Sequence, residues 1–200
     1  MPPPSALPIP SRDAGWRTIP NLISLLRLFC VPIFVWLLLS EQRPLAAAIL
    51  LAVLGATDWV DGWIARKYDQ GSAIGQVLDP VADRILLITA AVTLLIDGTV
   101  PWWIGALVLF REALISLAVV LLAAAGAKRI EVQWAGKAGT LGLMFALPGF
   151  LLLTILSGGI HTFIYLSTWS ATFGGLLLSY WAAVNYVPLA RIALREGRAE

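Results

Sequence analysis

The chain contains 200 residues, of which 59% are hydrophobic and only 13% are charged. Ordinary soluble domains carry roughly 25% charged residues, so the composition argues against a soluble domain and predicts a single integral membrane domain. The formal net charge of +2 is too small to indicate nucleic-acid binding. The single cysteine, Cys30, excludes an intrachain disulfide.

Residues 1–18 contain five prolines and no helical periodicity, which predicts a disordered tail beside the membrane interface. The apolar run that follows has about 20 residues, enough to cross a bilayer. Glycine, proline or polar residues interrupt the rest of the chain, and no internal repeat is visible. We therefore expect an all-α membrane protein whose domain, 19–200, contains six transmembrane helices. The expected helices are 19–39, 44–66, 72–97, 101–126, 136–157 and 163–190.

The basic residues gather on one side of these helices. They occur in the N-terminal tail, in the loops after the second and fourth helices and at the C-terminus, whereas Arg43 alone lies on the other side. Basic loops stay in the cytoplasm. We therefore expect both termini in the cytoplasm, and a polar active-site cavity that opens on the cytoplasmic side.

Four aspartates, Asp58, Asp61, Asp79 and Asp83, lie inside or against the apolar runs. An aspartate at the centre of a membrane helix costs about 2.5–3.5 kcal/mol, so such residues need a partner and are commonly functional. Each pair is three or four residues apart and therefore shares one helix face. No cysteine or histidine lies nearby, and carboxylate oxygens favour Mg²⁺ or Mn²⁺ over zinc. The four carboxylates predict a divalent metal site.

The small residues Gly62, Ala65 and Gly75 lie on the same two segments. They would let a bulky ligand approach the backbone, as glycines do in phosphate-binding loops. Small residues also allow transmembrane helices to pack closely, and the sequence leaves both explanations open.

Asp79 and Pro80 raise a question about where the third helix begins. Asp followed by Pro is typical of an N-cap and the first helical position, which would start the helix late. We favour a helix that begins near Ser72 and includes Pro80, since membrane helices tolerate an internal proline.

The stretch from Asp58 to Asp83 contains D-x2-D-G-x2-A-R-x8-G-x3-D-x3-D, with no departure at its eight fixed positions. This pattern resembles the signature of the CDP-alcohol phosphotransferase family. P-N-x2-S-x2-R-x4-P, from Pro20 to Pro32, and the six-helix layout also resemble that family. The resemblance implies that CDP-diacylglycerol donates its phosphatidyl group to an acceptor hydroxyl and that CMP leaves. It further implies a homodimer in the bacterial inner membrane.

The resemblance also implies roles for individual residues. Two Mg²⁺ or Mn²⁺ ions would neutralise the donor's pyrophosphate, while a carboxylate takes the acceptor's proton. Asp83 is the expected base. The expected metal ligands are Asp58, Asp61, Asp79 and Asp83. The expected nucleotide-binding residues are Asp58, Gly62, Ala65, Arg66 and Gly75, with helix-1 contacts from Asn21 and Arg27.

Arg111 and Glu112 lie in the middle of the fourth expected helix. Either they form an internal ion pair that locks two helices, or Arg111 holds an anionic acceptor. Lys137, at the cytoplasmic start of the fifth helix, would extend the basic surface, as would Lys128 and Arg129. For Lys128 and Arg129 we favour the simpler explanation that they anchor a cytoplasmic loop.

The segments FREALIS, 110–116, and WAGKAGT, 134–140, resemble the bacterial branch of the family that makes phosphatidylglycerophosphate or cardiolipin. Enzymes that use glycerol 3-phosphate often carry a second arginine later in the fourth helix and a second lysine two positions after Lys137. Here the corresponding regions, 116–120 and Gly139, contain neither charge. A phosphate monoester carries nearly two negative charges and a phosphodiester one. We therefore favour phosphatidylglycerol as acceptor, with glycerol 3-phosphate as the alternative, and inositol phosphate fits less well.

A membrane transporter is the alternative of another class, because transporters also place carboxylates within the membrane. Transporters commonly show paired halves or broken helices, and no such symmetry is visible here. A scaffold without catalytic activity would not need four aspartates at these intervals. The sequence therefore favours an enzyme.

Overall fold

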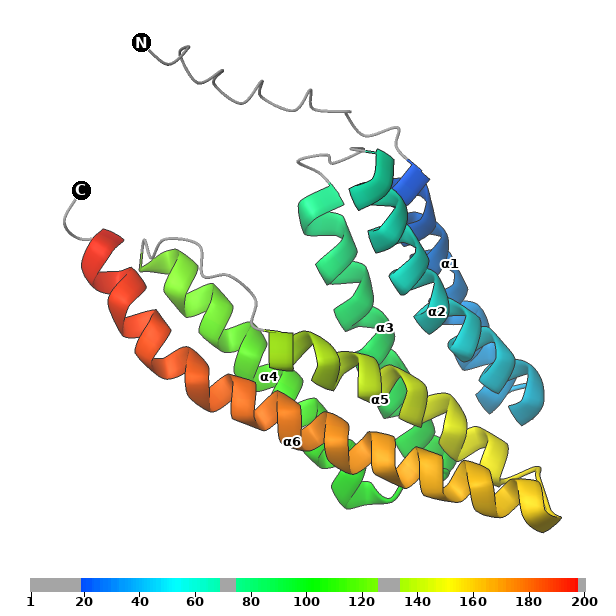
Figure 1. Cartoon of the computed structure of the whole chain (residues 1–200). Coiled ribbons are helices and arrows are strands. Elements are labelled where there is room, and N and C mark those ends of the chain that lie inside the picture. The colour runs from blue at the N-terminus through cyan, green and yellow to red at the C-terminus, as the bar shows by residue number, and fades with distance from the viewer. Residues whose placement is uncertain (1–18, 69–74, 126–133, 198–200) are drawn as a thin grey trace, which may run out of the picture.

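The computed structural model describes the backbone of residues 19–68, 75–125 and 134–197. Figure 1 shows six α-helices in this part of the chain: α1 Ile19–Leu39, α2 Pro44–Tyr68, α3 Gly75–Asp97, α4 Trp102–Ala124, α5 Trp134–Leu153 and α6 Gly158–Gly197. For the described residues, the prediction of an all-helical protein with six helices is confirmed. Most helix ends lie within a few residues of the expected ranges, but α6 is longer at both ends. The predicted tail, 1–18, lies outside the described residues.

Successive helices run in opposite directions. In Figure 1 the start of α1, the end of α2 and the start of α3 lie towards one end of the molecule, and the turns after α1, α3 and α5 lie towards the other. Two of these turns contain glycines with positive φ, Gly98 at 77° and Gly158 at 73°. Glycine adopts this conformation without steric cost. These two turns therefore lie where glycines interrupt the apolar sequence.

The packing of the helices places α3 in contact with several neighbours. α1 packs against α2 and α3, α3 packs against α4 and α5, and α5 packs against α2 and α6. The helix α3 continues through Pro80 instead of beginning there. This observation favours the continuous helix over the N-cap at Asp79, so that Asp79 and Asp83 belong to the same helix.

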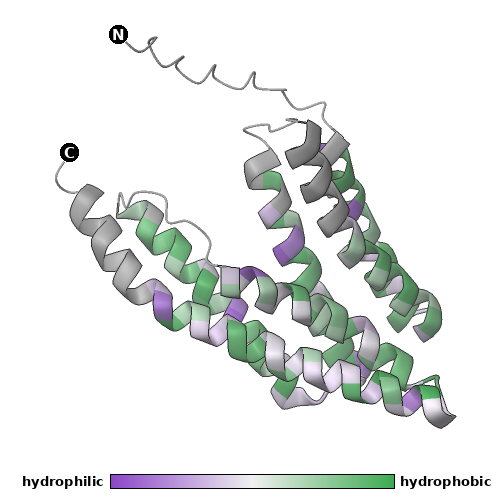
Figure 2. Cartoon of the chain, in the orientation of Figure 1, coloured by the Kyte–Doolittle hydropathy of each residue, from purple (hydrophilic) through white to green (hydrophobic). Residues whose placement is uncertain are grey.

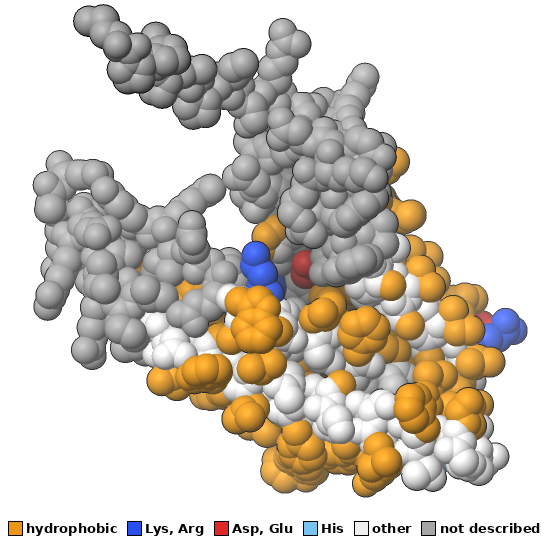
Figure 3. All heavy atoms as spheres, in the orientation of Figure 1, with side chains coloured by type: hydrophobic (Ala, Val, Ile, Leu, Met, Phe, Trp, Pro, Cys, Tyr) orange, Lys and Arg blue, Asp and Glu red, His pale blue; other side chains and the backbone are white. Residues whose placement is uncertain are grey.

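The interior of the bundle is apolar, with buried side chains from all six helices such as Phe34, Leu87, Leu143 and Leu176. Figure 2 shows hydrophobic residues along the described parts of the helices. Large hydrophobic side chains cover much of the described surface that Figure 3 shows. Soluble proteins rarely expose contiguous apolar areas of this extent. Because so many hydrophobic side chains face outward, the surface is typical of a protein in contact with lipid.

Three of the described helices are long and apolar enough to cross a membrane by length and composition alone. They comprise Asn21–Leu39 of α1, Trp102–Leu122 of α4 and Trp134–Leu153 of α5. Within the described side chains of α2, the apolar segment is Pro44–Thr57, which is shorter than these three.

The helices α5 and α6 approach each other closely through small residues. An added Cβ at Gly139 would lie 2.8 Å from both the carbonyl oxygen of Gly175 and the backbone nitrogen of Ser179. At Gly142 it would lie 3.2 Å from the Cα of Gly175. Small residues let transmembrane helices pack at short range. We call Gly139, Gly142 and Gly175 the glycine seam.

Gly139→Ala is expected to lower the free energy of unfolding by about 1–3 kcal/mol, the usual cost of overpacking. The backbone of α6 blocks the new methyl group and cannot rotate away as a side chain could. Gly174→Ala is the matched control, because an added Cβ there meets nothing within 4 Å. Thermal unfolding of the purified variants in detergent measures the difference. Equal unfolding temperatures for Gly139→Ala and Gly174→Ala would contradict close packing at the glycine seam.

Candidate active site

The four motif aspartates lie on two consecutive helices. The backbone of Asp58 and Asp61 belongs to the last turns of α2, and that of Asp79 and Asp83 belongs to the first turns of α3. Both helix ends lie at the same end of the molecule in Figure 1. Several of the predicted site residues have side chains outside the described part of the chain, so the predicted ligand set and nucleotide contacts stay predictions. These are Asp58, Asp61, Asp79, Gly62, Ala65, Arg66 and Gly75.

Asp83 is the motif aspartate whose side chain the structure describes, and Arg27 of α1 contacts it. The Nη1 group of Arg27 donates a hydrogen bond to Oδ1 of Asp83, which forms an ion pair between α1 and α3. The Arg27 side chain is fully buried, whereas the Asp83 side chain is 21% exposed. A buried cation requires a nearby opposite charge. Arg27 therefore fixes the orientation of Asp83 while part of the Asp83 side chain stays accessible.

The polar residues of the P-N-x2-S-x2-R pattern lie buried along α1. Asn21, Ser24 and Arg27 are each no more than 2% exposed. They are three residues apart and therefore follow one side of the helix. The contact between Arg27 and Asp83 shows that this side reaches α3. The pattern therefore brings a polar surface of α1 to the helix that carries Asp79 and Asp83.

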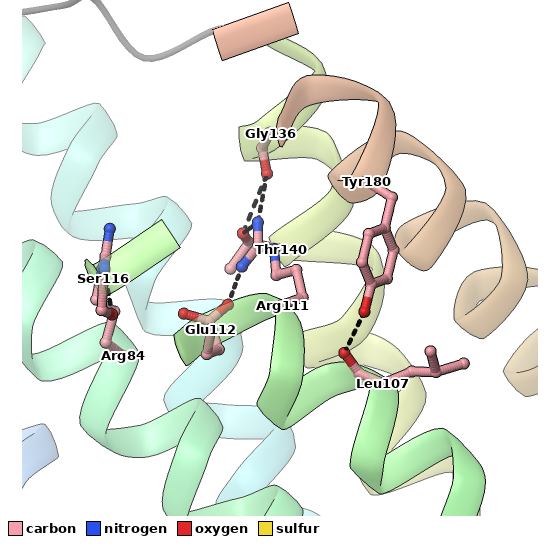
Figure 4. Close-up of polar contacts among 8 residues, drawn as sticks. All are labelled: Arg84, Leu107, Arg111, Glu112, Ser116, Gly136, Thr140 and Tyr180. Carbon is pink, nitrogen blue, oxygen red and sulfur yellow. Dashed lines mark hydrogen bonds and ion pairs between the residues drawn. The ribbon is translucent and has the colours of Figure 1, made fainter. Parts of the chain in front are cut away.

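Arg111 and Glu112 are both buried in α4, with 4% and 2% of their surface exposed. The Nη1 group of Arg111 pairs with Oε1 of Glu112, and Nη2 donates a hydrogen bond to Oγ1 of Thr140 at 2.9 Å. Figure 4 shows that Nη2 also points to the carbonyl oxygen of Gly136, 3.5 Å away. The ion pair considered in the sequence analysis therefore exists, but both partners belong to α4. The link to α5 is the hydrogen bond to Thr140.

Lys137 lies in the first turns of α5, between the two α5 residues that Arg111 contacts. Its side chain is exposed, and no described carboxylate lies within ion-pair distance of it. Lys128 and Arg129 lie outside the described residues. A role for Arg111, Lys137, Lys128 or Arg129 in acceptor binding therefore stays a prediction.

Arg84 is a polar residue of this region to which the sequence analysis assigned no role. Its Nη1 group donates a hydrogen bond to Oγ of Ser116 in α4 at 2.7 Å, as Figure 4 shows. The signal that could have found it is a charged residue at the start of a long apolar run. No sequence signal indicated that its partner would be Ser116.

Residues 17–184 match the sequence model of the CDP-alcohol phosphatidyltransferase family. The chain belongs to this family. The match spans α1 to α5 and most of α6. All four motif aspartates and the contacts of Arg27, Arg84 and Arg111 therefore lie within the family domain.

Two relatives of this CDP-alcohol phosphatidyltransferase illustrate the activities found in the family. The chain is 37% identical over 183 residues to cardiolipin synthase (CMP-forming) of Streptomyces coelicolor, and the alignment covers 89% of this chain and 85% of the relative. It is 32% identical over 185 residues to CDP-diacylglycerol–glycerol-3-phosphate 3-phosphatidyltransferase of Escherichia coli, and this alignment covers 88% of the chain and 96% of the relative. The chain is therefore an enzyme of phospholipid biosynthesis, and its apolar helices agree with a membrane protein.

The chemistry of the phosphatidyltransferase motif agrees with a hard divalent cation. Aspartate oxygens are suitable ligands for Mg²⁺ or Mn²⁺, and Asp83 contributes a carboxylate that is still accessible. Among the described side chains, no group of three potential ligands occurs. The metal site predicted from the motif therefore depends on the aspartates of α2 and on Asp79.

Arg111→Met is expected to lower the free energy of unfolding by about 3–5 kcal/mol, because it leaves the buried Glu112 carboxylate without its cation. The double variant Arg111→Met/Glu112→Met removes both charges and is expected to regain most of this loss. Thermal unfolding in detergent compares the single and double variants with the unmodified protein.

The matched control is Arg43→Met, whose partner Glu41 lies 3.7 Å away in a pair with an exposed arginine. Exposed pairs contribute about 0–1 kcal/mol, so this variant is expected to unfold almost as the unmodified protein does. A double variant as unstable as Arg111→Met would contradict the proposed cause, the unpaired buried carboxylate.

Proposed function

We propose that the chain transfers the phosphatidyl group of CDP-diacylglycerol to a hydroxyl of phosphatidylglycerol, so that CMP leaves and cardiolipin forms. The observation that carries the choice of acceptor is the glycine seam. Glycerol 3-phosphate enzymes often have a second lysine at the position of Gly139, and here the backbone of α6 occupies the space beside that residue. An acceptor with a single negative charge suits a site that lacks this lysine. The similarity to the Streptomyces coelicolor cardiolipin synthase supports the proposal.

Glycerol 3-phosphate is the second candidate acceptor. It is supported by the similarity to the Escherichia coli enzyme named for that substrate, since the alignment covers 96% of that relative. The two candidates share the donor, the leaving group and the new phosphodiester bond. They differ in the charge and size of the acceptor.

The donor site consists of the motif residues of α2 and α3. Asp58, Asp61 and Asp79 would hold two Mg²⁺ or Mn²⁺ ions, and Asp83, the fourth carboxylate of the motif, would lie beside them. Such ions neutralise the charge of a pyrophosphate and of the leaving CMP. The nucleotide would lie against Gly62, Ala65, Arg66 and Gly75, where small residues let a ligand approach the backbone.

Asp83 is the general base of this proposal. Its carboxylate is accessible enough to meet the acceptor hydroxyl, while Arg27 fixes its orientation. A base must lie within hydrogen-bond distance of the proton that it takes. The acceptor's hydroxyl therefore has to approach the first turns of α3, and its phosphate would contact Arg111 and Lys137, with Lys128 and Arg129 nearby.

The proposed enzyme has six transmembrane helices and both termini in the cytoplasm of a bacterial cell. The distribution of basic residues supports this orientation in the inner membrane. The alternating directions of α1 to α6 and the apolar surface are consistent with it. A homodimer is implied by the family resemblance.

Asp58→Asn, Asp61→Asn and Asp79→Asn are each expected to abolish transfer, because a neutral amide is a weak ligand for a hard cation. The measurement is metal-dependent CMP release from CDP-diacylglycerol by each purified variant. Asp97→Asn is the matched control, since Asp97 lies at the far end of α3, where it contacts Thr99. Activity close to normal in any of the three variants would exclude that residue as an essential ligand.

Asp83→Asn separates the base from the metal ligands. This variant is expected to bind CDP-diacylglycerol in the presence of metal and to lose transfer, because a base is needed only for the acceptor's proton. Loss of donor binding in a correctly folded variant would instead assign Asp83 to the metal site.

The acceptor assay tests the proposed function directly. Purified protein with CDP-diacylglycerol and Mn²⁺ or Mg²⁺ is given phosphatidylglycerol or glycerol 3-phosphate separately, and the lipid product is identified by mass. Cardiolipin is the expected product, and glycerol 3-phosphate is expected to be used poorly. Efficient use of glycerol 3-phosphate without any use of phosphatidylglycerol would overturn the choice of acceptor and leave the family assignment intact.

A further inference from the structure

Arg84 differs from the other arginines whose side chains the structure describes. Arg27, Arg43 and Arg111 each pair with a carboxylate. Arg84 is partly buried, its partner is the neutral hydroxyl of Ser116, and no described carboxylate lies within ion-pair distance. A cation within a membrane helix is costly unless an anion compensates its charge. The charge of Arg84 is therefore available for an anionic ligand.

The geometry of the guanidinium group suits a phosphate. An arginine has five N–H donors in a planar fork, and the fork can bind two phosphate oxygens at once. The hydroxyl of Ser116 accepts a hydrogen bond from Nη1 at 2.7 Å. This contact fixes the direction of the side chain and leaves other donors of the guanidinium for a ligand.

The surroundings of Arg84 favour an anion more than those of Arg111 do. Arg111 already contacts Glu112, Thr140 and the carbonyl of Gly136, so several of its donors are used within the protein. The positive charges of Arg84 and Arg111 nevertheless act on each other. In Figure 4, the two arginines are drawn on either side of Glu112. A negatively charged group bound at Arg84 would reduce this repulsion.

Arg84 also lies within reach of the phosphate of an acceptor whose hydroxyl meets Asp83. It directly follows Asp83, the proposed base, and adjacent Cα atoms are about 3.8 Å apart. In glycerol 3-phosphate and in phosphatidylglycerol, three glycerol carbons separate the reacting terminal hydroxyl from the phosphate. The two ends of one acceptor can therefore meet two neighbouring side chains of α3.

The contact with Ser116 brings the positive charge of Arg84 to a part of α4 that carries no charge of its own. Ser116 begins the region 116–120, where enzymes that use glycerol 3-phosphate often carry a second arginine. Here Arg84 reaches this position from α3. The other missing charge cannot be supplied in the same way, because α6 fills the space beside Gly139.

We propose that Arg84 binds the phosphate of the glycerol-containing acceptor and that Ser116 positions its guanidinium group. This inference rests on the proposed function, and it adds a specificity-determining residue to the acceptor side of the site. Enzymes that use glycerol 3-phosphate, a phosphate monoester, often carry a second arginine and a second lysine. In this protein Arg84 supplies one positive charge in their place. The arrangement therefore favours an acceptor with one negative charge.

The test compares the apparent KM values for acceptor and donor in purified protein. Arg84→Gln is expected to raise the KM for phosphatidylglycerol about ten- to a hundredfold, the effect of losing one charge-assisted contact. The KM for CDP-diacylglycerol is expected to change little. Arg84→Lys keeps the charge but loses the fork, so a smaller increase is expected. Ser116→Ala keeps Arg84 and is expected to raise the acceptor KM about three- to tenfold.

Arg43→Gln is the matched control for the loss of one positive charge, because Arg43 lies in the turn after α1, far from this region in Figure 1. Size-exclusion chromatography in detergent identifies any variant that fails to fold. If Arg84→Gln fails to fold, Ser116→Ala decides the question, since it retains the charge.

An unchanged acceptor KM in the folded variants would overturn the role of Arg84, as would an equal increase in the donor KM. Unmodified protein that uses only glycerol 3-phosphate would overturn the proposed acceptor, and the same KM comparison with that substrate then decides the role of Arg84. Unmodified protein that transfers to neither acceptor would overturn both proposals. The failure of each proposal is therefore distinguishable.

Discussion

A charge buried in a membrane protein requires an opposite charge nearby, because neither lipid nor an apolar core can solvate it. This constraint shapes the interior of the molecule. Arg27 is fully buried and pairs with Asp83, and Arg111 is buried and pairs with Glu112. The free energy of these pairs depends on both members, so neither arginine can be understood apart from its carboxylate. Both pairs cost desolvation energy, and the pair of Arg27 and Asp83 specifies which faces of α1 and α3 must meet.

The polar contacts connect the helices in a particular order. Asp83 joins α3 to α1, and Arg84, the next residue, joins α3 to α4. Arg111 then joins α4 to α5 through Thr140. Adjacent residues on a helix point about 100° apart, so one turn of α3 can reach two different neighbours. The proposed base and the proposed phosphate-binding arginine are consequently held by two different neighbours of the same helix, α1 and α4.

The helices were predictable because apolar runs and the residues that interrupt them follow directly from the solubility of side chains. The motif spacing also predicted that Asp79 and Asp83 lie on one helix, which holds because α3 continues through Pro80. The partner of Asp83 was not predictable, because Arg27 is 56 positions away and the pairing depends on how α1 rotates against α3. The ion pair of Arg111 was anticipated as a link between two helices, yet Glu112 is its neighbour on α4.

Gly139 illustrates a second limit of the sequence. The absence of a lysine at this position is visible in the sequence, but the reason for it lies in the distance to α6. Only the position of the α6 backbone reveals that packing alone excludes a longer side chain there.

The length of α6 affects how the protein sits in a bilayer. With 40 residues at 1.5 Å each, this helix is about 60 Å long, twice the hydrocarbon thickness of about 30 Å. Even when inclined by about 40°, the upper end of the usual range, it would extend beyond the hydrocarbon. Because α5 packs along it through the glycine seam, the two helices must tilt together. A change in membrane thickness would thus be accommodated by sliding more or less of α6 into the headgroup layer, without separating the seam.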